Sequence, residues 1–427
     1  MSQSIIVLGA GSIGVATATH LLQRGWDVTM VDREPPASET SYGNAGVINA
    51  ASFVPLNNPG LHASLAKYLR NNTAQLRYNW PYILKNIPWA LQFLQSSKTR
   101  ASRISCDALH QLTTPALDEH KAMMQRAGNM HRLSEKGWLK VYRKGAGYNE
   151  QSFEAQLYAE HGIDIQTLDA AGIHDLEPSL RQIYSAGYLV SGAACINNPS
   201  ALIKEYAEQF VKDGGKLLQE NVSSLSFNAN QTHCHLENGK RLSSDQLVVA
   251  AGPWSGDILA TTGYTVPMRF ERGYHAHYHF ADGETLGRSV HDIDSGFIMS
   301  PMEQGLRITT GVELNHRDAP PNYSQLAQVM PAVHEAIGIT ERTDDPLWCG
   351  SRPTFPDSRP VIGPAPSQPG LWVAFGHHHI GVMTGPITGK ALAEQISNEP
   401  LCMDMKPFSP ARYIRRKRGS GSSGAAN

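Results

Sequence analysis

Residues 5–33 read IIVLGAGSIGVATATHLLQRGWDVTMVDR, and this stretch decides the fold. An apolar run at 5–8 predicts a strand, which is followed by a GxGxxG pattern and by apolar residues at helical spacing. A second apolar run, 28–31, predicts another strand and ends at Asp32. The sequence therefore predicts a β-α-β unit of the kind that binds dinucleotides.

Each glycine of that pattern has its own physical role. Gly9 permits the tight turn after the strand, Gly11 lets the backbone approach a pyrophosphate, and Gly14 lets helix and strand pack closely. The free N–H groups at the N-terminus of the helix then face the phosphates. Asp32 is placed to accept hydrogen bonds from ribose hydroxyls. NAD and FAD share this fingerprint, so the choice between them depends on the rest of the chain.

The composition excludes some classes of function. The chain has 427 residues, more than one hydrophobic core usually supports, so we expect two domains. Its 37 Lys and Arg balance 38 Asp and Glu, which argues against nucleic acid as a partner. Five cysteines without a CxxC pair indicate a reducing compartment, and no apolar stretch reaches the about 18 residues of a membrane span. We therefore expect a cytoplasmic protein with a small-molecule ligand.

Three later stretches carry small residues where the backbone would approach a ligand. They read ETSYGNAGVI at 39–48, QLVVAAGPWSG at 246–256 and GHHHIGVMTGPITGKALAEQI at 376–396. The second contains an apolar strand that ends in small residues, and ligands of open α/β sheets bind at that edge. The third begins as a loop and becomes a helix, with Thr384 as its expected N-cap and Pro386 in its first turn. The positive end of this helix would stabilise negative charge on a bound cofactor.

Together with ERGYH at 271–275 and GSRPTFPDSRPVIG at 350–363, these stretches carry a family resemblance over nearly the whole chain. The chain resembles the flavin-dependent glycine/D-amino-acid oxidase (DAO) superfamily, most closely the bacterial D-amino-acid dehydrogenases. The resemblance implies an α/β fold, with a discontinuous Rossmann-like FAD-binding domain and an inserted α+β substrate-binding domain on a mixed or antiparallel sheet.

The expected domain boundaries follow from this resemblance and from the alternation of elements along the chain. We expect the FAD-binding domain in three segments and the substrate-binding domain in two: 1–57, 193–262 and 352–405 for the former, 58–192 and 263–351 for the latter. Residues 406–427 contain a basic run that begins at Arg412, and we expect them to form a disordered tail.

The resemblance implies non-covalent FAD, with Asp32 on the adenosine ribose. It assigns contacts with the cofactor to residues of the shared motifs and to a strand after LLQEN: Gly9, Gly11, Ser12, Ile13, Gly14, Arg33, Ser41, Gly43, Asn44, Ala45, Gly46, Val47, Val222, Ala251, Gly252, Trp254, Gly376, His379, Ile380, Gly381, Val382, Met383 and Thr384. Cys349 is close to where some sarcosine-oxidase relatives attach their flavin. It is offset by one residue, which would turn it to the other side of a strand.

The implied reaction is oxidative deamination of an amino or imino acid, either a D-amino acid or a proline-like substrate. Hydride would pass from Cα to flavin N5, and the electrons to a quinone or another acceptor. The alternatives are an oxygen-using glycine/sarcosine-type oxidase and an electron-relaying subunit of a hetero-oligomeric dehydrogenase. The expected catalytic residues are Arg352, Tyr274 and His378. The guanidinium would hold both oxygens of the substrate carboxylate, unless it forms an interdomain ion pair with Asp357.

Two groups of histidines raise the question of a metal site. His377, His378 and His379 are consecutive, so their side chains diverge and converge poorly on one ion. In RGYHAHYHF, three histidines at period two from His275 onward share one face of an expected strand, a spacing that can bind zinc and that half-buried strands also show. We expect no metal at either place. We expect Tyr274, on the opposite face of that strand, to line the active-site cavity.

Residues 78–94, YNWPYILKNIPWALQFL, are rich in tryptophan and leucine. Packing of helices against a core explains them most simply. The alternative is a docking surface for a membrane or a partner subunit, which would place the protein peripherally on the inner face of the inner membrane.

Overall fold

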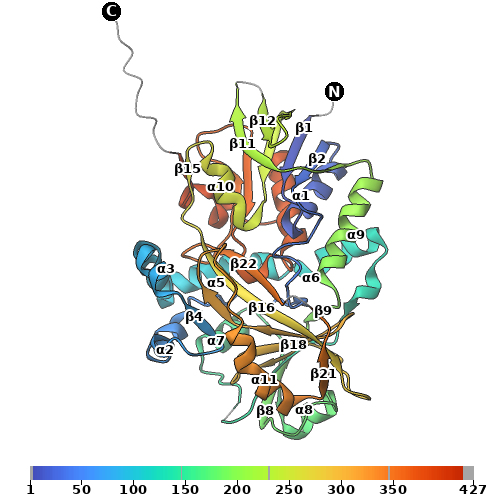
Figure 1. Ribbon diagram of the computed structural model, residues 1–427, viewed down its shortest axis with the longest axis vertical. Helices are drawn as coiled ribbons and strands as arrows, with labels where there is room; N and C mark the ends of the chain where they lie inside the picture. Colours follow the sequence, from blue (N-terminus) through green and yellow to red (C-terminus); the bar gives the residue numbers. More distant parts are fainter. Residues whose placement is uncertain (1–2, 146, 229–230, 345–346, 417–427) are drawn as a thin grey trace, which may run out of the picture.

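The computed structural model describes residues 3–145, 147–228, 231–344 and 347–416. Figure 1 shows two bodies stacked along the long axis, each built around its own sheet. The first segment of the chain, in blue, and the last, in red, lie together in the upper body. The fold is mixed α/β, as the sequence predicts. Of the expected tail, residues 417–427 lie outside the described part.

The upper body contains a six-stranded sheet in the order β10-β2-β1-β14-β24-β23. All neighbouring strands pair in parallel except β23 and β24, which are antiparallel. The strands have these bounds: β1 Ser4–Leu8, β2 Asp27–Asp32, β10 Lys216–Gln219, β14 Gln246–Val249, β23 Val361–Pro364 and β24 Leu371–Phe375. They come from the three segments assigned to the FAD-binding domain, so segments far apart in the sequence are neighbours in this sheet.

Successive residues of the first strand face two different cores. Ile5 and Val7 pack with a layer of helices, whereas Ile6 and Leu8 pack with a smaller antiparallel sheet on the other side. Because both faces are covered, the strand is a continuous apolar run rather than an alternating one. The covering elements are α1 Ser12–Gln23, α9 Pro199–Lys212 and α12 Gly385–Ile396 on one side, and β11 Val222–Phe227, β12 Thr232–Leu236, β13 Arg241–Ser244 and α10 Ser255–Ala260 on the other.

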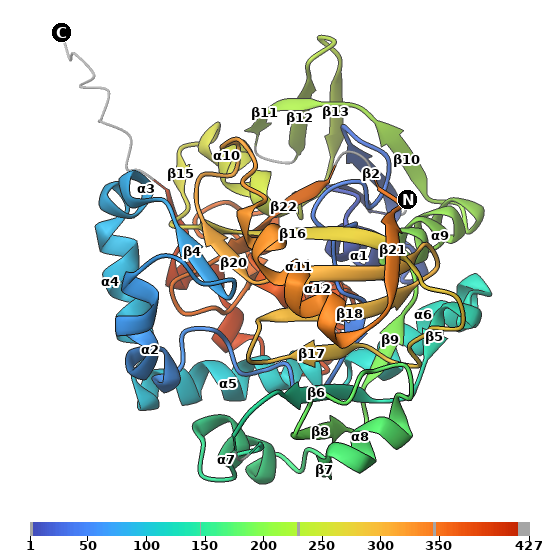
Figure 2. The same cartoon turned by 60° about the horizontal axis from the view of Figure 1, so that its bottom comes forward.

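The lower body contains an eleven-stranded sheet centred on the long strand β16, Arg269–Phe280 (Figure 2). One edge of β16 pairs with β19 and β20, and the other pairs with β21 and β22. The bounds of the other strands are β4 Leu76–Tyr78, β6 Trp138–Tyr142, β7 Ile165–Asp169, β8 Ala186–Val190, β17 Val290–Asp292, β18 Phe297–Met302, β19 Gly305–Thr310, β20 Val312–Leu314, β21 Ile339–Arg342 and β22 Trp348–Thr354. Helix α11, Ser324–Ala336, packs on the side of this sheet that faces away from the upper body.

The remaining helices surround the lower sheet or pack against the helices of the upper body. Their bounds are α2 Pro59–Leu69, α3 Trp80–Lys85, α4 Ile87–Ser96, α5 Thr99–Thr113, α6 Ala116–Ala127, α7 Phe153–Glu160 and α8 Ala170–Leu176. A separate three-stranded sheet joins the two bodies through β3 Val47–Ile48, β9 Ala194–Ile196 and β5 Leu133–Ser134. Within the described residues, no helix has the length and apolar character needed to cross a bilayer.

The expectation of a disordered tail from residue 406 onward is wrong for the described part of that segment. Strand β25, Arg415–Arg416, pairs with β15, Tyr264–Thr265. Phe408 and Ile414 are buried, and Arg412 Nε lies 3.3 Å from a carboxylate oxygen of Asp357. Two buried apolar side chains and an ion pair therefore hold this segment against the upper body, although its charge pattern alone is typical of a tail.

Candidate active site

A cavity of about 990 Å³ lies between the two bodies, and both contribute to its walls. Most residues that the sequence assigns to a cofactor line it: Gly9, Gly11, Ser12, Ile13, Asp32, Arg33, Ser41, Gly43, Asn44, Ala45, Val47, Val222, Ala251, Gly252, Trp254, Gly376, His379, Ile380, Gly381, Val382 and Met383. The expected catalytic residues Arg352 and His378 line it as well, but Tyr274 does not. The loops that line the upper wall follow the carboxyl ends of β1, β2, β14 and β24, as expected for an open α/β sheet.

The turn after β1 forms one end of this wall. Gly9 has φ 109°, and a Cβ there would lie 2.4 Å from the backbone oxygen of Ala250, so only glycine fits. At Gly11 the nearest atom to such a Cβ is Ser41 Oγ at 3.4 Å, so the protein leaves room on this side for a ligand. The backbone N–H of Ala10 donates to the Asp32 carboxylate over 2.6 Å, which fixes that carboxylate at the cavity.

Three residues assigned to the cofactor do not line the cavity and instead support its wall. A Cβ at Gly14 would lie 1.8 Å from Gly9 O, so Gly14 serves the close packing of α1 on the turn. Gly46 approaches the backbone of Ile196 in the same way. Thr384 is the N-cap residue of α12, but its hydroxyl donates to Ile380 O over 2.9 Å instead of capping the helix.

Two arginines flank Trp254 on the wall near Val222. The guanidinium carbon of Arg33 lies 4.3 Å from the centre of a Trp254 ring, and that of Arg317 lies 5.2 Å away. Arg33 is also paired with Glu39 over 2.9 Å. Arg317 is paired with Asp257 over 2.7 Å and with Asp318 over 2.9 Å, so carboxylates balance the charge of both arginines on this wall.

The loop that follows β2 is held from below by Arg307 of β19. Arg307 donates to the backbone oxygens of Tyr42, over 3.0 Å, and Asn44. Its guanidinium is buried, and burial lowers its pKa to about 10. A Cβ at Gly43 would lie 1.9 Å from Trp348 Cη2, so the indole of Trp348 lies directly against this loop and lines the cavity. Sequence reasoning missed both Arg307 and Trp348, because they meet the loop only through the pairing of distant strands.

All three residues of the histidine triplet line the cavity, and their side chains have different environments. His377 is hydrogen-bonded to Thr388 Oγ1 over 3.2 Å, and His378 and His379 are bonded to each other through their Nδ1 atoms over 2.9 Å. His379 is exposed to the cavity, while His378 is buried with φ 38° and has no hydrogen-bond partner for Nε2 in the described part of the chain.

The triplet is electrically neutral. Desolvation lowers the pKa of His377 to about 3, and desolvation together with nearby Arg352 lowers the pKa of His379 to about 4. The pKa of His378 is lowered well below its ordinary value, first by desolvation and then by its neighbours. The positive charge that faces the triplet therefore comes from Arg352 on the opposite, lower wall.

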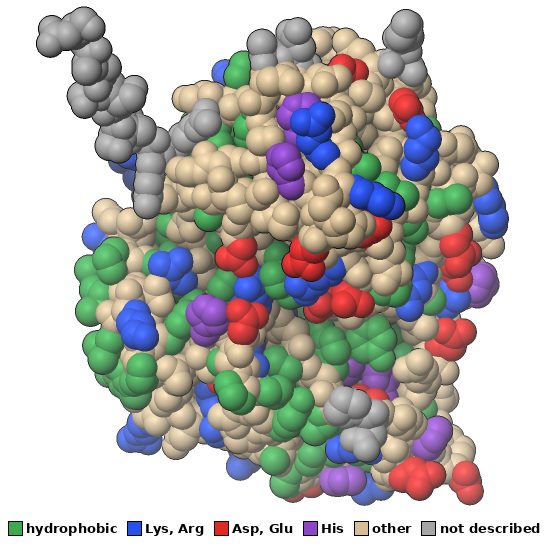
Figure 3. Space-filling view, turned by 45° about the horizontal axis from the view of Figure 1, so that its top comes forward, with side chains coloured by type: hydrophobic (Ala, Val, Ile, Leu, Met, Phe, Trp, Pro, Cys, Tyr) green, Lys and Arg blue, Asp and Glu red, His purple; other side chains and the backbone are tan. Residues whose placement is uncertain are grey.

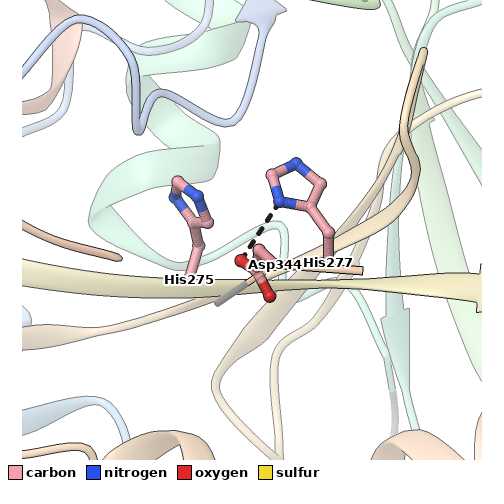
Figure 4. A group of neighbouring side chains, drawn as sticks. All are labelled: His275, His277 and Asp344. Carbon is pink, nitrogen blue, oxygen red and sulfur yellow. Dashed lines mark hydrogen bonds and ion pairs between the residues drawn. The ribbon is translucent and has the colours of Figure 1, made fainter. Parts of the chain in front are cut away.

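Of the second group of histidines, only His277 is hydrogen-bonded to Asp344 (Figure 4), and neither ring nitrogen of buried His275 has a hydrogen-bond partner in the described part of the chain. Ligand atoms of His275, His277 and Asp344 lie within 4.8 Å of one another. Arg307 Nε donates to His277 Nε2 over 2.9 Å, so His277 carries its proton on Nδ1, which donates to Asp344 over 3.3 Å. Both nitrogens of His277 are engaged and a guanidinium lies beside them, an arrangement that disfavours a cation. The absence of a metal stays a prediction.

Arg352 occupies the lower wall on β22, paired in register with Glu271 of β16. Its guanidinium extends over Gly273, where a Cβ would lie 2.2 Å from Nη2. Burial lowers the pKa of Arg352 and raises that of Glu271, while each charge opposes the shift of the other. In the described part of the chain, no carboxylate lies within 4.0 Å of this guanidinium. Asp357, the alternative partner, is paired with Arg359 over 2.7 Å and with Arg412.

The prediction that Tyr274 lines the cavity is wrong. Its hydroxyl donates to the carboxylate of Glu313, and its ring packs with Ala276 and Leu326 on the side of α11. The period of two was read correctly, but the opposite face of β16, which carries Glu271, is the one that lines the cavity. The sequence pattern alone does not tell which of two half-buried faces meets the ligand.

A second polar region lines the cavity at the sheet of the lower body. Lys140 Nζ lies 2.9 Å from Glu154 Oε1 and over the rings of Trp138 and Tyr188. Burial alone would lower the pKa of Lys140, but the Glu154 carboxylate and neighbouring tyrosines raise it well above its ordinary value. Burial opposes ionisation of Glu154 too, yet Lys140 keeps its pKa low. Both groups are therefore charged. The lysine inside the apolar strand WLKVY was the available sequence signal.

Comparisons with known proteins agree with this geometry. The model of a family described as "DAO: FAD dependent oxidoreductase" matches residues 4–395. A D-amino-acid oxidase of Bradyrhizobium diazoefficiens is 28% identical over 421 residues, 96% of this chain and 99% of that protein. A D-amino acid dehydrogenase of Dechloromonas aromatica is 27% identical over 406 residues, 92% and 96% of the two chains.

Solved structures share the fold at lower identity. L-proline dehydrogenase from P. horikoshii has a TM-score of 0.72 at 17% identity, with 96% of this chain and 97% of that chain covered. Glycine oxidase from Geobacillus kaustophilus has a TM-score of 0.68 at 20% identity, with 96% and 98% covered. With the family model matching almost the whole chain, and with the glycine turn, Asp32 and the small-residue loops lining one cavity, the protein belongs to the DAO family of FAD-dependent oxidoreductases.

Proposed function

We propose that the protein oxidises the Cα–N bond of an amino or imino acid, a D-amino acid or a proline-like compound, and passes the electrons to a quinone or another carrier. The observation that carries this proposal is Arg352, a half-buried cation that lines the cavity and has no carboxylate within 4.0 Å among the described residues. A guanidinium without a close carboxylate is available to the carboxylate of a substrate, which its planar fork can hold by two hydrogen bonds.

The residues present fit FAD. The cavity runs from Val222 and Trp254 past the glycine turn to Trp348, and Gly11 leaves space for a pyrophosphate. FAD, when bound, supplies the acceptor for the hydride of Cα. Attachment is non-covalent in this proposal, because Cys349 packs beside Tyr274 on the α11 side and is not among the residues that line the cavity.

The chain's own groups then bind and orient the substrate. Arg352 holds the carboxylate by two hydrogen bonds, which fixes the direction of Cα. Glu271 lines the same cavity beside Arg352, and its raised pKa suits a carboxylate that takes the proton from the substrate ammonium group. His378 offers a buried nitrogen without a partner as a further substrate contact. Trp348 limits access of water on the side of the Gly43 loop.

Absorbance and a substrate screen test this proposal. The purified protein should show flavin absorbance, the colour should leave the protein on acid precipitation, and a D-amino acid or a proline should bleach it without oxygen. Colour that stays with the precipitated protein would contradict non-covalent attachment. A flavin that no amino or imino acid reduces would contradict the reaction and favour the electron-relaying subunit.

Oxygen is a second candidate for the electron acceptor, because the similar proteins include both an oxidase and a dehydrogenase. We expect slow reoxidation of the substrate-reduced enzyme in air-saturated buffer and fast reoxidation by a quinone. Fast reoxidation by oxygen with stoichiometric hydrogen peroxide would assign the protein to the oxidases instead. In this proposal the quinone acts at a membrane, and the protein approaches the membrane peripherally.

A further inference from the structure

Large hydrophobic side chains are exposed on the layer formed by α2, α3 and α4. Among the described residues, nine large hydrophobic side chains are exposed, and five of them lie on these helices. We call these five the apolar patch: Leu69, Trp80, Leu84, Ile87 and Leu91. Leu69, Leu84 and Leu91 each expose more than half of their surface, at 64%, 61% and 61%. Such a concentration on one outer layer is unusual for a surface that faces water only.

Helix α4 is apolar on two sides. Trp89 and Phe93 are buried with Leu61 of α2 in a small core of their own, whereas Ile87 and Leu91, one turn apart, are exposed. The helix, IPWALQFLQS, contains no charged residue. A surface helix needs only one apolar face to pack on its protein, so the second face is available to a partner.

The charged residues of the stretch that carries the apolar patch have one sign. The stretch 58–104 contains no acidic residue, and its basic residues are Lys67, Arg70, Arg77, Lys85, Lys98, Arg100 and Arg103. Arg77 is held by Ser324 and Gln328, and Arg103 is paired with Glu160. The other five are exposed, and within the described residues none of them forms an ion pair; we call them the basic rim. The whole chain is nearly neutral, so this excess is local.

We propose that the apolar patch and the basic rim dock the protein on an anionic lipid bilayer. Apolar side chains of this kind enter the boundary between headgroups and acyl chains, and basic side chains beside them are attracted to anionic headgroups. In Figure 3 hydrophobic side chains gather at the left margin of the molecule with Lys and Arg among them. A bilayer complements both features at once, over a surface formed by several short helices.

The cavity opens beside this surface. Lys67 and Tyr68 of α2 line the cavity together with Leu56 and Asn58, and Lys67 is also exposed. Docking through α2 to α4 therefore brings an opening of the cavity close to the bilayer. If the proposed function holds, a lipid-soluble quinone meets the protein at that opening, but the docking itself requires neither the reaction nor a substrate.

The test uses the flavin-loaded full-length protein and vesicle flotation without substrate. We expect binding to vesicles of phosphatidylcholine mixed with phosphatidylglycerol, and much weaker binding to phosphatidylcholine alone. Leu84→Glu/Leu91→Glu should lower the partition coefficient by about tenfold or more, because two inserted apolar side chains are replaced by charges. The matched control is Val211→Glu/Leu401→Glu, which places the same charges on exposed apolar positions outside the patch and should bind normally.

Two further double variants test the contribution of the basic rim to vesicle binding. Lys85→Glu/Lys98→Glu should weaken binding to the anionic vesicles, while Lys144→Glu/Lys240→Glu, exposed lysines outside 58–104, should weaken it less. No binding of the folded, flavin-containing protein to anionic vesicles would overturn the proposal. It would also be overturned if Leu84→Glu/Leu91→Glu left vesicle binding unchanged but abolished self-association in sedimentation, because the patch would then join copies of this chain.

Discussion

The upper and lower walls of the cavity are built in different ways. The upper wall presents backbone at Gly9, Gly11 and the loop of Gly43, with charged groups such as Asp32 and Arg33 beside it. The lower wall presents side chains that ionise, including Arg352, Glu271 and the Lys140–Glu154 pair. A wall of backbone suits one large cofactor that is always the same, whereas a wall of charged side chains suits a small ligand that must be selected and oriented.

The largest effect should come from filling the upper wall. Gly11→Val should give a folded protein almost without flavin, since its Cβ meets no protein atom closer than 3.4 Å and its branches occupy the space of the pyrophosphate. The ratio of flavin to protein absorbance measures this. Gly192→Val, where a Cβ meets no atom within 4 Å, should keep its flavin. Normal flavin content in Gly11→Val would mean that the cofactor does not pass this turn.

A change of charge on the lower wall should spare the flavin and reduce catalysis. Arg352→Ala should lower kcat/KM by about 30-fold to several thousand-fold, the range for losing one partner of a buried charge pair. Arg352→Lys should recover only part of this, because it keeps the charge and loses the planar fork. Steady-state kinetics on the best amino-acid substrate measure kcat/KM of both variants. Near-normal kcat/KM in Arg352→Ala would exclude the carboxylate clamp.

A smaller change beside the same arginine sharpens the comparison. In Gly273→Ala the new Cβ would lie 2.2 Å from Arg352 Nη2, so the flexible end of the arginine must move. We expect kcat/KM to fall by about 10- to 100-fold, as misplacement of a binding group typically costs, with flavin content unchanged. Gly192→Ala provides the control. Unchanged kinetics in Gly273→Ala would show that the position of the guanidinium does not matter.

The smallest effect should be one of stability. Lys140→Met leaves Glu154 without its cation, and because the Glu154 side chain is 41% exposed to the cavity we expect a loss of only about 1–3 kcal/mol in the free energy of unfolding. Lys140→Met/Glu154→Gln should recover most of it. Denaturant titration measures both, and an unstable double variant would argue that packing of Lys140 on the rings of Trp138 and Tyr188 matters more than the pair.

The loss in the free energy of unfolding caused by Lys140→Met should depend on pH, and the direction of this dependence follows from the two pKa shifts. The pKa of Glu154 is lowered in the folded protein, so its contribution is present above the unfolded value of about 4.3 and is lost as the pH falls through the folded pKa. The pKa of Lys140 is raised, so its contribution is present below about 10.4 and is lost only at higher pH. The difference between wild type and Lys140→Met should therefore be constant at neutral pH and shrink in acid.

The same contrast explains what could be predicted from the sequence. The glycine turn, Asp32 and the small-residue loops are local patterns with one geometry each, so most of the upper wall was anticipated. The prediction that Arg352 holds the substrate carboxylate depended on the family resemblance. Trp348 and Arg307 depend on how distant strands pair, and the Lys140–Glu154 pair depends on how α7 packs beside β6; no local pattern specifies either arrangement. For the same reason the sequence places Tyr274 on the wrong face of its strand and predicts a tail where residues 406–416 are ordered.

The order of strands in the upper sheet has a consequence for synthesis of the chain. Strand β1 lies between β2 and β14, β14 pairs with β24, and α1 packs against α12. Strand β1 therefore lacks its neighbour β14 until residues 246–249 have been made, and α1 lacks α12 until residues 385–396 have been made. Because contacts between distant segments form slowly, the nascent upper sheet exposes apolar strands throughout elongation. The part of the cavity wall formed by residues 376–383 is thus completed late in the synthesis of each molecule.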